Sequence, residues 1–497
     1  MTREVSPLKL TFADYIIITA ILLLGAALRV DSAAADVRFH SDEALYSTYA
    51  RTAAVYGHWM LDGPLDKPPL SIYANAIGMH LFAARFTPQG VIDVPIRTGE
   101  LAAKLPNLFA GMIAIVLTGV LARRLYPTRG RTISLVAMLL AALSPYYVAY
   151  SASAFTDMLM LTFMLAAVAA AVRDLWGFSG LLLALSVSAK PQGILYLPLI
   201  AGIWLLSPGR QINGIFRFGL TFAGGLLALL IWDAARPETS VFTLGSINIS
   251  QGRLVMPPDT WLPRLETWLN HADGLLGPAW LTPALVAYGV IPALFRRRPV
   301  DLALVVTAGG LFFLHWIGAF HTFDRYLLVL VPLLIVLTAR TVYSSWTQLP
   351  PRLQHPVLAS LLIIAAVTAG ISAEHDPRAD VFRPTSPDGY SRLADWLNAK
   401  PLGTIVYDRW LGWEMGYYRG AWSDKRWVYY PDAPGLADDA LLNPDPAPRY
   451  FVAPDDPTRD VQPWLDALRL RGFTVTLTYD QDALHAYEII PPWATYR

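Results

Sequence analysis

Five short stretches of the chain combine charged and aromatic residues that could support chemistry. They are SDEALY (Asp42, Glu43, Tyr46), DKPPL (Asp66, Lys67), AFTDMLM (Asp157), SAKPQG (Lys190) and HTFDRYLL (His321, Asp324, Arg325, Tyr326). A carboxylate can act as a general base on a hydroxyl group. Lys, Arg or a divalent ion can stabilise a departing phosphate oxyanion. These residue types could therefore move a group from a phosphate to a hydroxyl, provided that the fold brings them together.

The composition identifies the kind of scaffold that must position these stretches. The chain has 497 residues, of which 54% are hydrophobic and 15% are charged, whereas a soluble domain carries about 25% charged residues. The net charge of +1 gives no reason to expect binding to nucleic acid. Because there is no cysteine, disulfides and thiolate metal sites are excluded. The composition predicts a polytopic membrane protein.

Eleven apolar runs are long enough to be candidate membrane spans, which need about 17 to 25 residues. They are residues 14–30, 100–121, 133–150, 158–172, 175–189, 191–206, 218–234, 279–295, 301–319, 326–345 and 357–373. The pair at 175–206 is short and meets at Lys190-Pro191, so it could be one broken hairpin. We therefore expect about eleven transmembrane helices.

The basic residues predict the orientation of these spans. When the N-terminus, with Arg3 and Lys9, is cytoplasmic, every alternate loop is basic, as the positive-inside rule requires. The segments then expected outside are 31–99, 151–157, 190, 235–278, 320–325 and everything after about 374. A cleaved signal peptide also fits the basic start and the following SAAAD stretch, but ten further spans favour a retained anchor. All five polar stretches fall on the outer side.

Residues 375–497 have a different character. They contain 18 carboxylates against 13 Lys and Arg. The strand-like stretches GTIVYD, RWVYY, RYFVAP and GFTVTLTY alternate with helix-like stretches, which predicts a small α/β domain with a largely parallel or mixed sheet. The expected division is a membrane domain over 1–374, including the first outer loop at 31–99, and an extracytoplasmic domain over 375–497.

Each polar residue also has a purely structural interpretation. Lys190 and Arg325 could be interfacial cations, and Asp42 and Asp157 could cap helices. Ionisable groups at the ends of membrane helices are costly unless they pair or bind a ligand. Purely structural roles would have to arise independently for five stretches on the same face. A single shared site explains all five together. With the amphipathic, aromatic-rich helices expected over 39–85, the pattern indicates group transfer from a lipid phosphate.

The first loop resembles that of GT-C fold glycosyltransferases of the protein O-mannosyltransferase and lipid A aminoarabinose transferase group. The shared elements are Asp42-Glu43, Gly57-His58-Trp59 and Asp66-Lys67-Pro68-Pro69. AFTDMLMLTFMLA, SAKPQGILYLPL and DRYLLVLVPLL resemble later segments of the same family, in the same order. The resemblance covers nearly the whole membrane part.

This resemblance implies roles for particular residues. Asp42, with Glu43 and Asp157, would form the catalytic group, and Asp42 would be the base or the carboxylate that orients the acceptor. Lys67, Lys190, Arg325 and Tyr326 would hold the donor phosphate. Some members bind a divalent metal such as Mg, Mn or Zn, for which Asp66 and His271 are the matching candidates, although His271 could be a solvated loop histidine. The chain departs from the family at Asp66, at Pro-Gln-Gly after Lys190, and at Leu45, where many relatives carry Arg.

Together these features predict an inverting glycosyltransferase in a plasma or inner membrane. It would transfer a sugar from a polyprenyl phosphate to a hydroxyl of a protein, lipid or glycan at the outer face. The alternatives are a transporter or flippase, or a sensor whose outer domain binds a substrate. Transporters usually place their ionisable groups near mid-membrane between internal repeats, whereas here the groups lie at one surface and no repeat is visible.

Overall fold

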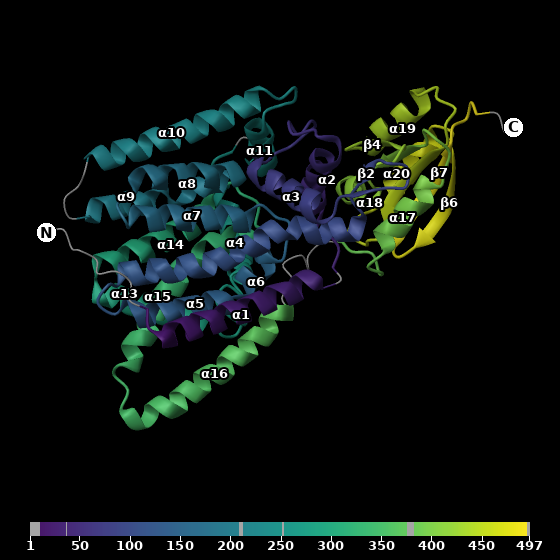
Figure 1. Cartoon of the computed structure of the whole chain (residues 1–497). Helices are drawn as coiled ribbons and strands as arrows, with labels where there is room; N and C mark the ends of the chain where they lie inside the picture. The colour runs from purple at the N-terminus through teal and green to yellow at the C-terminus, as the bar shows by residue number, and fades with distance from the viewer. Residues whose placement is uncertain (1–9, 36, 208–211, 251–252, 375–381, 495–497) are drawn as a thin grey trace. The chain divides into compact units, whose positions relative to one another are not determined.

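A computed structural model describes residues 10–35, 37–207, 212–250, 253–374 and 382–494 (Figure 1). The predicted cytoplasmic residues Arg3 and Lys9 lie outside this described part. The chain forms two compact units. The first comprises residues 1–34, 59–75 and 104–377, and the second comprises residues 35–58, 76–103 and 378–497. Parts of the first outer loop thus belong to the same compact unit as the C-terminal residues.

The first unit is built from helices. Their bounds are α1 Phe12–Ala34, α5 Gly130–Leu143, α6 Pro145–Ser151, α7 Asp157–Ala171, α8 Trp176–Ala189, η1 Pro191–Tyr196, α9 Leu197–Leu206, α10 Ile212–Ala234, α11 Val241–Ser250, η2 Pro258–Thr260, α12 Trp261–His271, α13 Thr282–Arg296, α14 Pro299–Ile317, η3 Asp324–Leu330, α15 Val331–Trp346 and α16 Pro351–Glu374. Two more helices, α3 (Leu70–Phe82) and α4 (Ile96–Leu125), contribute residues to both units. Helix α8 packs between α7 and α10 (Figure 1).

All eleven predicted spans are helical, but their lengths differ. Within the described residues, five helices are long and apolar enough to cross a membrane: α1, α4, α10, α14 and the continuous run from η3 to α15. A sixth span results if α5 and α6, which meet at an angle of 59°, count as one broken span. The helices α7, α8 and α13, and η1 together with α9, are apolar but shorter. These helices identify a membrane protein, whereas the count of eleven spans stays a prediction.

The break between α5 and α6 follows from proline chemistry. Pro145 cannot continue α5, so Ser144 adopts an extended backbone and its hydroxyl accepts from the Tyr147 amide. The break frees the carbonyls at the end of α5. Arg29 of α1, which is fully buried, donates to the carbonyls of Ala141 and Ala142 at 3.3 and 3.2 Å. The guanidinium therefore satisfies acceptors that apolar surroundings would otherwise leave without a donor.

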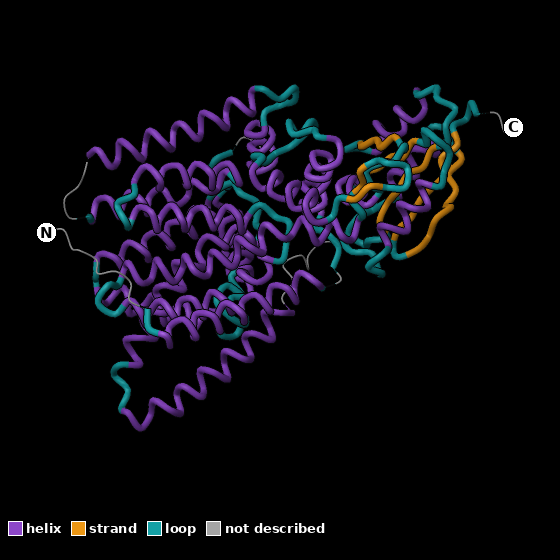
Figure 2. Tube along the Cα trace, in the orientation of Figure 1, coloured by secondary structure: helices purple, strands orange, loops and turns teal. Residues whose placement is uncertain are grey.

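The second unit contains the sheet (Figure 2). Its elements are α2 Ser41–Tyr56, the short antiparallel pair β1 Arg85–Phe86 and β2 Ile92–Asp93, α17 Gly389–Asn398, β3 Ile405–Asp408, α18 Gly412–Tyr418, β4 Arg426–Tyr429, α19 Ala433–Leu442, β5 Arg449–Pro454, α20 Gln462–Leu470, β6 Thr474–Gln481 and β7 Leu484–Ile490. The strand order is β4-β3-β5-β7-β6, with β3 parallel to β4 and β5, and β7 antiparallel to β5 and β6. The predicted α/β domain with a mixed sheet is confirmed.

Candidate functional site

A buried ion pair joins the ends of α7 and α8. Pro191 stops α8, and Lys190 takes an extended backbone at that point. Its ammonium lies 2.5 Å from the Asp157 carboxylate, and the two side chains are 3% and 1% exposed. Asp157 is the first residue of α7, and the cap position belongs to Thr156. The structural interpretations of an interfacial Lys190 and a capping Asp157 are therefore wrong, because the two residues neutralise each other inside the protein.

Aromatic rings connect this pair to Arg325. The Lys190 ammonium lies 4.6 Å from the centre of the Tyr326 ring. The Arg325 guanidinium lies 4.4 Å from the Phe323 ring and 4.8 Å from the Phe155 ring. Such contacts attract a cation to the negative face of a ring. Arg325 is buried, so its charge is held inside the protein at the start of η3.

Lys67 belongs to the same group. Its ammonium pairs with the Asp66 carboxylate, and the side chain is 9% exposed. The start of α3 is held near Lys190, because the Ser71 hydroxyl donates to the carbonyl of the preceding residue, Ala189, at 3.5 Å. The charges of both Lys67 and Arg325 act on the Lys190 ammonium. We name Lys67, Lys190 and Arg325 the cation cluster; the structure brings these three predicted phosphate-binding residues together within the first unit.

Contacts from α10 fix the loop that presents Lys67. Arg236 donates to the Leu61 and Gly63 carbonyls at 3.0 and 2.7 Å. The Trp232 indole donates to the Tyr73 hydroxyl at 2.7 Å. These contacts hold the loop before Lys67 and the helix after it. The position of the ammonium is thus set by the helical scaffold.

The two proposed metal ligands, Asp66 and His271, each have a partner within the protein. One Asp66 oxygen is committed to Lys67, and the amide of Asn248 lies 3.5 Å from that same oxygen. The ring nitrogen Nε2 of His271 lies 3.0 Å from the Thr322 carbonyl oxygen. In the part of the chain that the structure describes, no three His, Asp or Glu side chains form a group able to hold a metal. The other Asp66 oxygen, Oδ1, is buried and has no hydrogen-bond partner among the described residues. A metal held by Asp66 and His271 therefore stays a prediction, and we assign no step to one.

An apolar groove is lined in part by the segment that follows Lys190 in sequence. It has a volume of about 740 Å³ and lies between the η1–α9 segment and α14. Ile194 of η1, the short helix that directly follows Lys190, lines it, as do Phe313 and Ile317 near the end of α14. Its polar lining is confined to a small fraction of the surface. A hydrocarbon chain is the kind of ligand that such walls favour.

In the second unit, Asp42 and Glu43 begin α2 but differ in their contacts. The side chain of His40 accepts from the Asp42 amide at 3.0 Å, and the Glu43 carboxylate accepts from the His40 amide at 3.0 Å. This is a capping box. Glu43 is fully buried, whereas Asp42 is partly exposed. The cap interpretation of Asp42 is wrong, because His40 and Glu43 supply the cap, and Glu43 has this structural role.

The sequence prediction missed two buried carboxyl groups in the second unit. Asp408 ends β3 and is fully buried, and Glu414 lies in α18 and is 3% exposed. Burial raises the pKa of Asp408 to about 6 and that of Glu414 to about 7. The available signal was a lone Glu among the aromatic residues of WLGWEMGYY. Perturbed carboxyls of this kind are typical of functional sites, although structural groups share the property.

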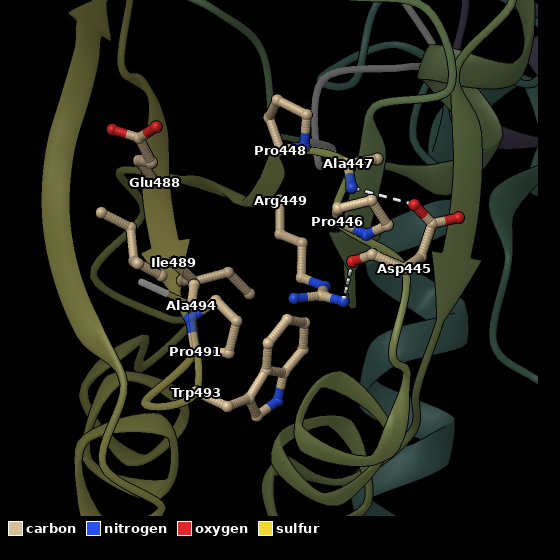
Figure 3. Close-up of a pocket in the computed structure, with 11 residues that line it drawn as sticks. Asp445, Pro446, Ala447, Pro448, Arg449, Glu488, Ile489, Pro491, Trp493 and Ala494 are labelled. Carbon is tan, nitrogen blue, oxygen red and sulfur yellow. Dashed lines mark hydrogen bonds between the residues drawn. The ribbon is translucent and has the colours of Figure 1, made fainter. Parts of the chain in front are cut away.

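A cavity of about 450 Å³ lies at another edge of the same sheet. Figure 3 shows Arg449, the first residue of β5, with Trp493 next to its guanidinium. Arg449 donates to the Asn443 and Asp445 carbonyls at 2.7 and 2.6 Å. These hydrogen bonds fix the turn that precedes β5. No predicted site residue lines this cavity, and we do not assign the reaction to it.

Comparison with known proteins identifies the fold. No protein-family model and no curated protein matches the chain. The structure of ArnT from Cupriavidus metallidurans bound to undecaprenyl phosphate matches with a TM-score of 0.61 and 13% identity, over 98% of this chain and 99% of that chain.

The oligosaccharyltransferase AglB from Archaeoglobus fulgidus also matches. Its complex with an inhibitory peptide and a dolichol-phosphate has a TM-score of 0.58 at 11% identity, over 96% of this chain and 74% of that chain. Its complex with Zn and sulfate has a TM-score of 0.56 at 12% identity, over 95% and 72%. As the sequence resemblance predicted, the chain has the GT-C fold of membrane glycosyltransferases.

Proposed function

We propose that this protein is a membrane glycosyltransferase that moves a sugar from a polyprenyl phosphate to the hydroxyl of an acceptor. The observation that carries the proposal is the cation cluster. Lys67, Lys190 and Arg325 converge within a largely apolar unit, where Asp66 and Asp157 hold the two lysines in place beside a third cation. A phosphate has the charge and geometry that such a group recognises.

The apolar groove supports a lipid-linked donor. It starts at the η1 helix that follows Lys190 and continues along α14. A phosphate held by the cation cluster would leave its hydrocarbon tail beside these walls. Two structures of the same fold contain undecaprenyl phosphate or a dolichol-phosphate, which supports the same class of donor here.

We assign the acceptor side to Asp42. In the proposed step, the acceptor oxygen attacks the anomeric carbon from the side opposite the phosphate, and the bond between that carbon and the phosphate oxygen breaks. The acceptor proton passes to the Asp42 carboxylate, and the polyprenyl phosphate leaves with its charge stabilised by the cation cluster. The configuration at the anomeric carbon is inverted. Glu43 supports this group by fixing the start of α2.

We further propose that the reaction occurs at the outer face of a plasma or inner membrane. The N-terminus would be cytoplasmic, and residues 375–497 would form an extracytoplasmic domain, as the alternating basic loops predict. The acceptor is a protein, lipid or glycan with a free hydroxyl.

A transfer assay with the purified full chain tests the function. The protein is incubated with polyprenyl-phosphate sugars and a hydroxyl acceptor, and the released polyprenyl phosphate is measured by mass spectrometry. We expect turnover by the wild type and its loss in Asp42→Asn. Substrate flux in liposomes without sugar transfer would instead support a transporter and overturn the proposal.

A further inference from the structure

A second apolar groove lies among helices of the first unit. Its volume is about 350 Å³, and residues of α5, α13, α15 and α16 supply most of its walls. Leucine, valine and isoleucine side chains dominate the lining. Among the described residues it shares no lining residue with the groove between η1–α9 and α14, and no member of the cation cluster lines it. It is therefore a separate candidate binding site.

Helix α16 forms the outer wall of this groove. It contacts α1, α5 and α6 of the same unit, and Figure 1 shows that its start stands apart from α1. Ile364 lines the groove and is 38% exposed, and its neighbours Ile363 and Val367 are more exposed still. Apolar surface of this kind favours contact with hydrocarbon over contact with water. The body of the groove thus suits an acyl chain.

One end of the groove carries polar and aromatic groups. Tyr343 and Trp346, in the last turns of α15, line it together with Thr132 near the start of α5. Tyrosine and tryptophan favour the boundary between membrane and water. The Arg129 guanidinium, just before α5, donates to the Tyr343 hydroxyl and lies 5.7 Å from the centre of that ring. A cation is therefore held at this end.

The charge of Arg129 is available to a ligand. Its side chain is exposed, and among the described residues no carboxylate lies within ion-pair distance of it. Arg131, two residues further on, differs because it pairs with the buried Asp14 at 2.6 Å. A guanidinium can hold a phosphate through two parallel hydrogen bonds. The arrangement of an apolar body and a cationic end matches a lipid with a phosphate headgroup.

The groove end and the cation cluster belong to opposite ends of one membrane-spanning run. Arg325 lies at the start of the continuous run Asp324–Trp346, and Tyr343 lies near its end. The alternating basic loops predict that the Tyr343 end is cytoplasmic. The cytoplasmic leaflet is the one rich in anionic lipid, and basic pockets between membrane helices on that side bind anionic headgroups.

We propose that this groove binds one anionic phospholipid of the inner leaflet. The acyl chains lie between α16 and the helices α5, α13 and α15, and the phosphodiester pairs with Arg129 beside Tyr343. The site is distinct from the one proposed for the polyprenyl phosphate. It does not depend on sugar transfer, because it is formed by other residues at the other end of the membrane span.

Native mass spectrometry of the full chain tests the headgroup preference. The probes are phosphatidylglycerol and phosphatidylcholine with the same acyl chains, since the choline cation offsets the phosphate charge. We expect the wild type to bind phosphatidylglycerol at least about fivefold more tightly, and Arg129→Ala to bind both lipids equally. Arg173→Ala makes the same change at an exposed residue after α7 and should keep the preference. No preference in the wild type, or the same preference in Arg129→Ala, overturns the proposal.

Filling the groove tests where the lipid lies. Ala365 lines the groove, so Ala365→Trp should abolish the phosphatidylglycerol adduct. Ala366→Trp, at the next and exposed residue of α16, should retain it. Lys67→Ala/Arg325→Ala should weaken binding of polyprenyl phosphate and leave the phosphatidylglycerol adduct intact, which separates this site from the proposed function. An adduct that survives Ala365→Trp, or that is lost in Lys67→Ala/Arg325→Ala, overturns the assignment.

Discussion

The cation cluster and the buried carboxyl groups Asp408 and Glu414 handle buried charge in opposite ways. In the first unit, Lys67 and Lys190 are each neutralised by a carboxylate. In the second unit, Glu414 lies near other carboxyl groups, and burial favours its protonated form. The first region keeps its lysines charged by pairing them with carboxylates, whereas the second keeps a carboxyl group neutral by retaining its proton.

This difference corresponds to the two halves of the proposed reaction. A departing phosphate needs permanent positive charge, and the cations that supply it must be fixed by partners before the phosphate arrives. An acceptor hydroxyl needs a base whose protonation can change near neutral pH. The comparison therefore predicts that substitutions in the two regions will produce different kinds of defect.

The largest effect is expected from removing the phosphate-binding charges. Lys67→Ala and Arg325→Ala should each lower the rate of transfer by about 10² to 10³, because each removes charge that stabilises the leaving phosphate. Lys400→Ala, on the C-terminal domain, makes the same change outside the cluster and should leave the rate unchanged. Full activity in both cluster variants would show that other residues bind the phosphate.

The Lys190–Asp157 pair should affect stability as well as activity. Lys190→Met leaves the buried Asp157 carboxylate without its partner, which we expect to cost about 3 to 5 kcal/mol in the free energy of unfolding. The double variant Lys190→Met/Asp157→Asn should recover much of this stability in a detergent melting experiment but no transfer activity. Recovery of both would make the pair purely structural.

The acidic region should make stability depend on pH. Unfolded Glu414 ionises near its ordinary pKa of 4.5, whereas the folded protein retains the proton up to about 7. Unfolding therefore releases a proton between these pH values, and the free energy of unfolding falls with rising pH by roughly 3 kcal/mol. Glu414→Gln should remove this part of the slope in melts recorded from pH 4 to 8. Asp408 contributes separately between its ordinary pKa of 3.8 and about 6. An unchanged slope in Glu414→Gln would contradict the assignment.

The smallest effect concerns Arg29, a buried cation that binds carbonyl groups at the helix break. Arg29→Met should lower the free energy of unfolding by about 1 to 3 kcal/mol, because it leaves those carbonyls without donors. The affinity for polyprenyl phosphate should not change. Arg352→Met, at an exposed position of α16, is the matched control. A loss of lipid affinity in Arg29→Met would mean that burial alone does not separate structural cations from binding ones.

Local sequence patterns predicted much of this organisation. Apolar runs located all eleven helical segments, and strand-like stretches located β3, β4, β5 and β6. Three polar residues that the sequence singled out, Lys67, Lys190 and Arg325, lie close together in the first unit. Periodicity and helix ends are properties of neighbouring residues, which is why one sequence is enough to find them.

Contacts between distant segments could not be predicted in this way. The packing of α18 on α2 joins residues more than 350 positions apart, as the contact between Arg51 and Tyr417 illustrates. No local pattern encodes that pairing, so Glu414 was not among the predicted site residues. The role of Glu43 in the capping box was also missed, since the motif usually begins with Ser or Thr and here begins with His40.

The most direct test of the central claim is the binding of polyprenyl phosphate to the purified protein, measured by native mass spectrometry. It requires no knowledge of the sugar or the acceptor. We predict a one-to-one adduct with the wild type and with Asp42→Asn, and at least tenfold weaker binding in Lys67→Ala/Arg325→Ala. Equal binding by the wild type and the double variant would contradict the claim that the cation cluster holds the lipid phosphate.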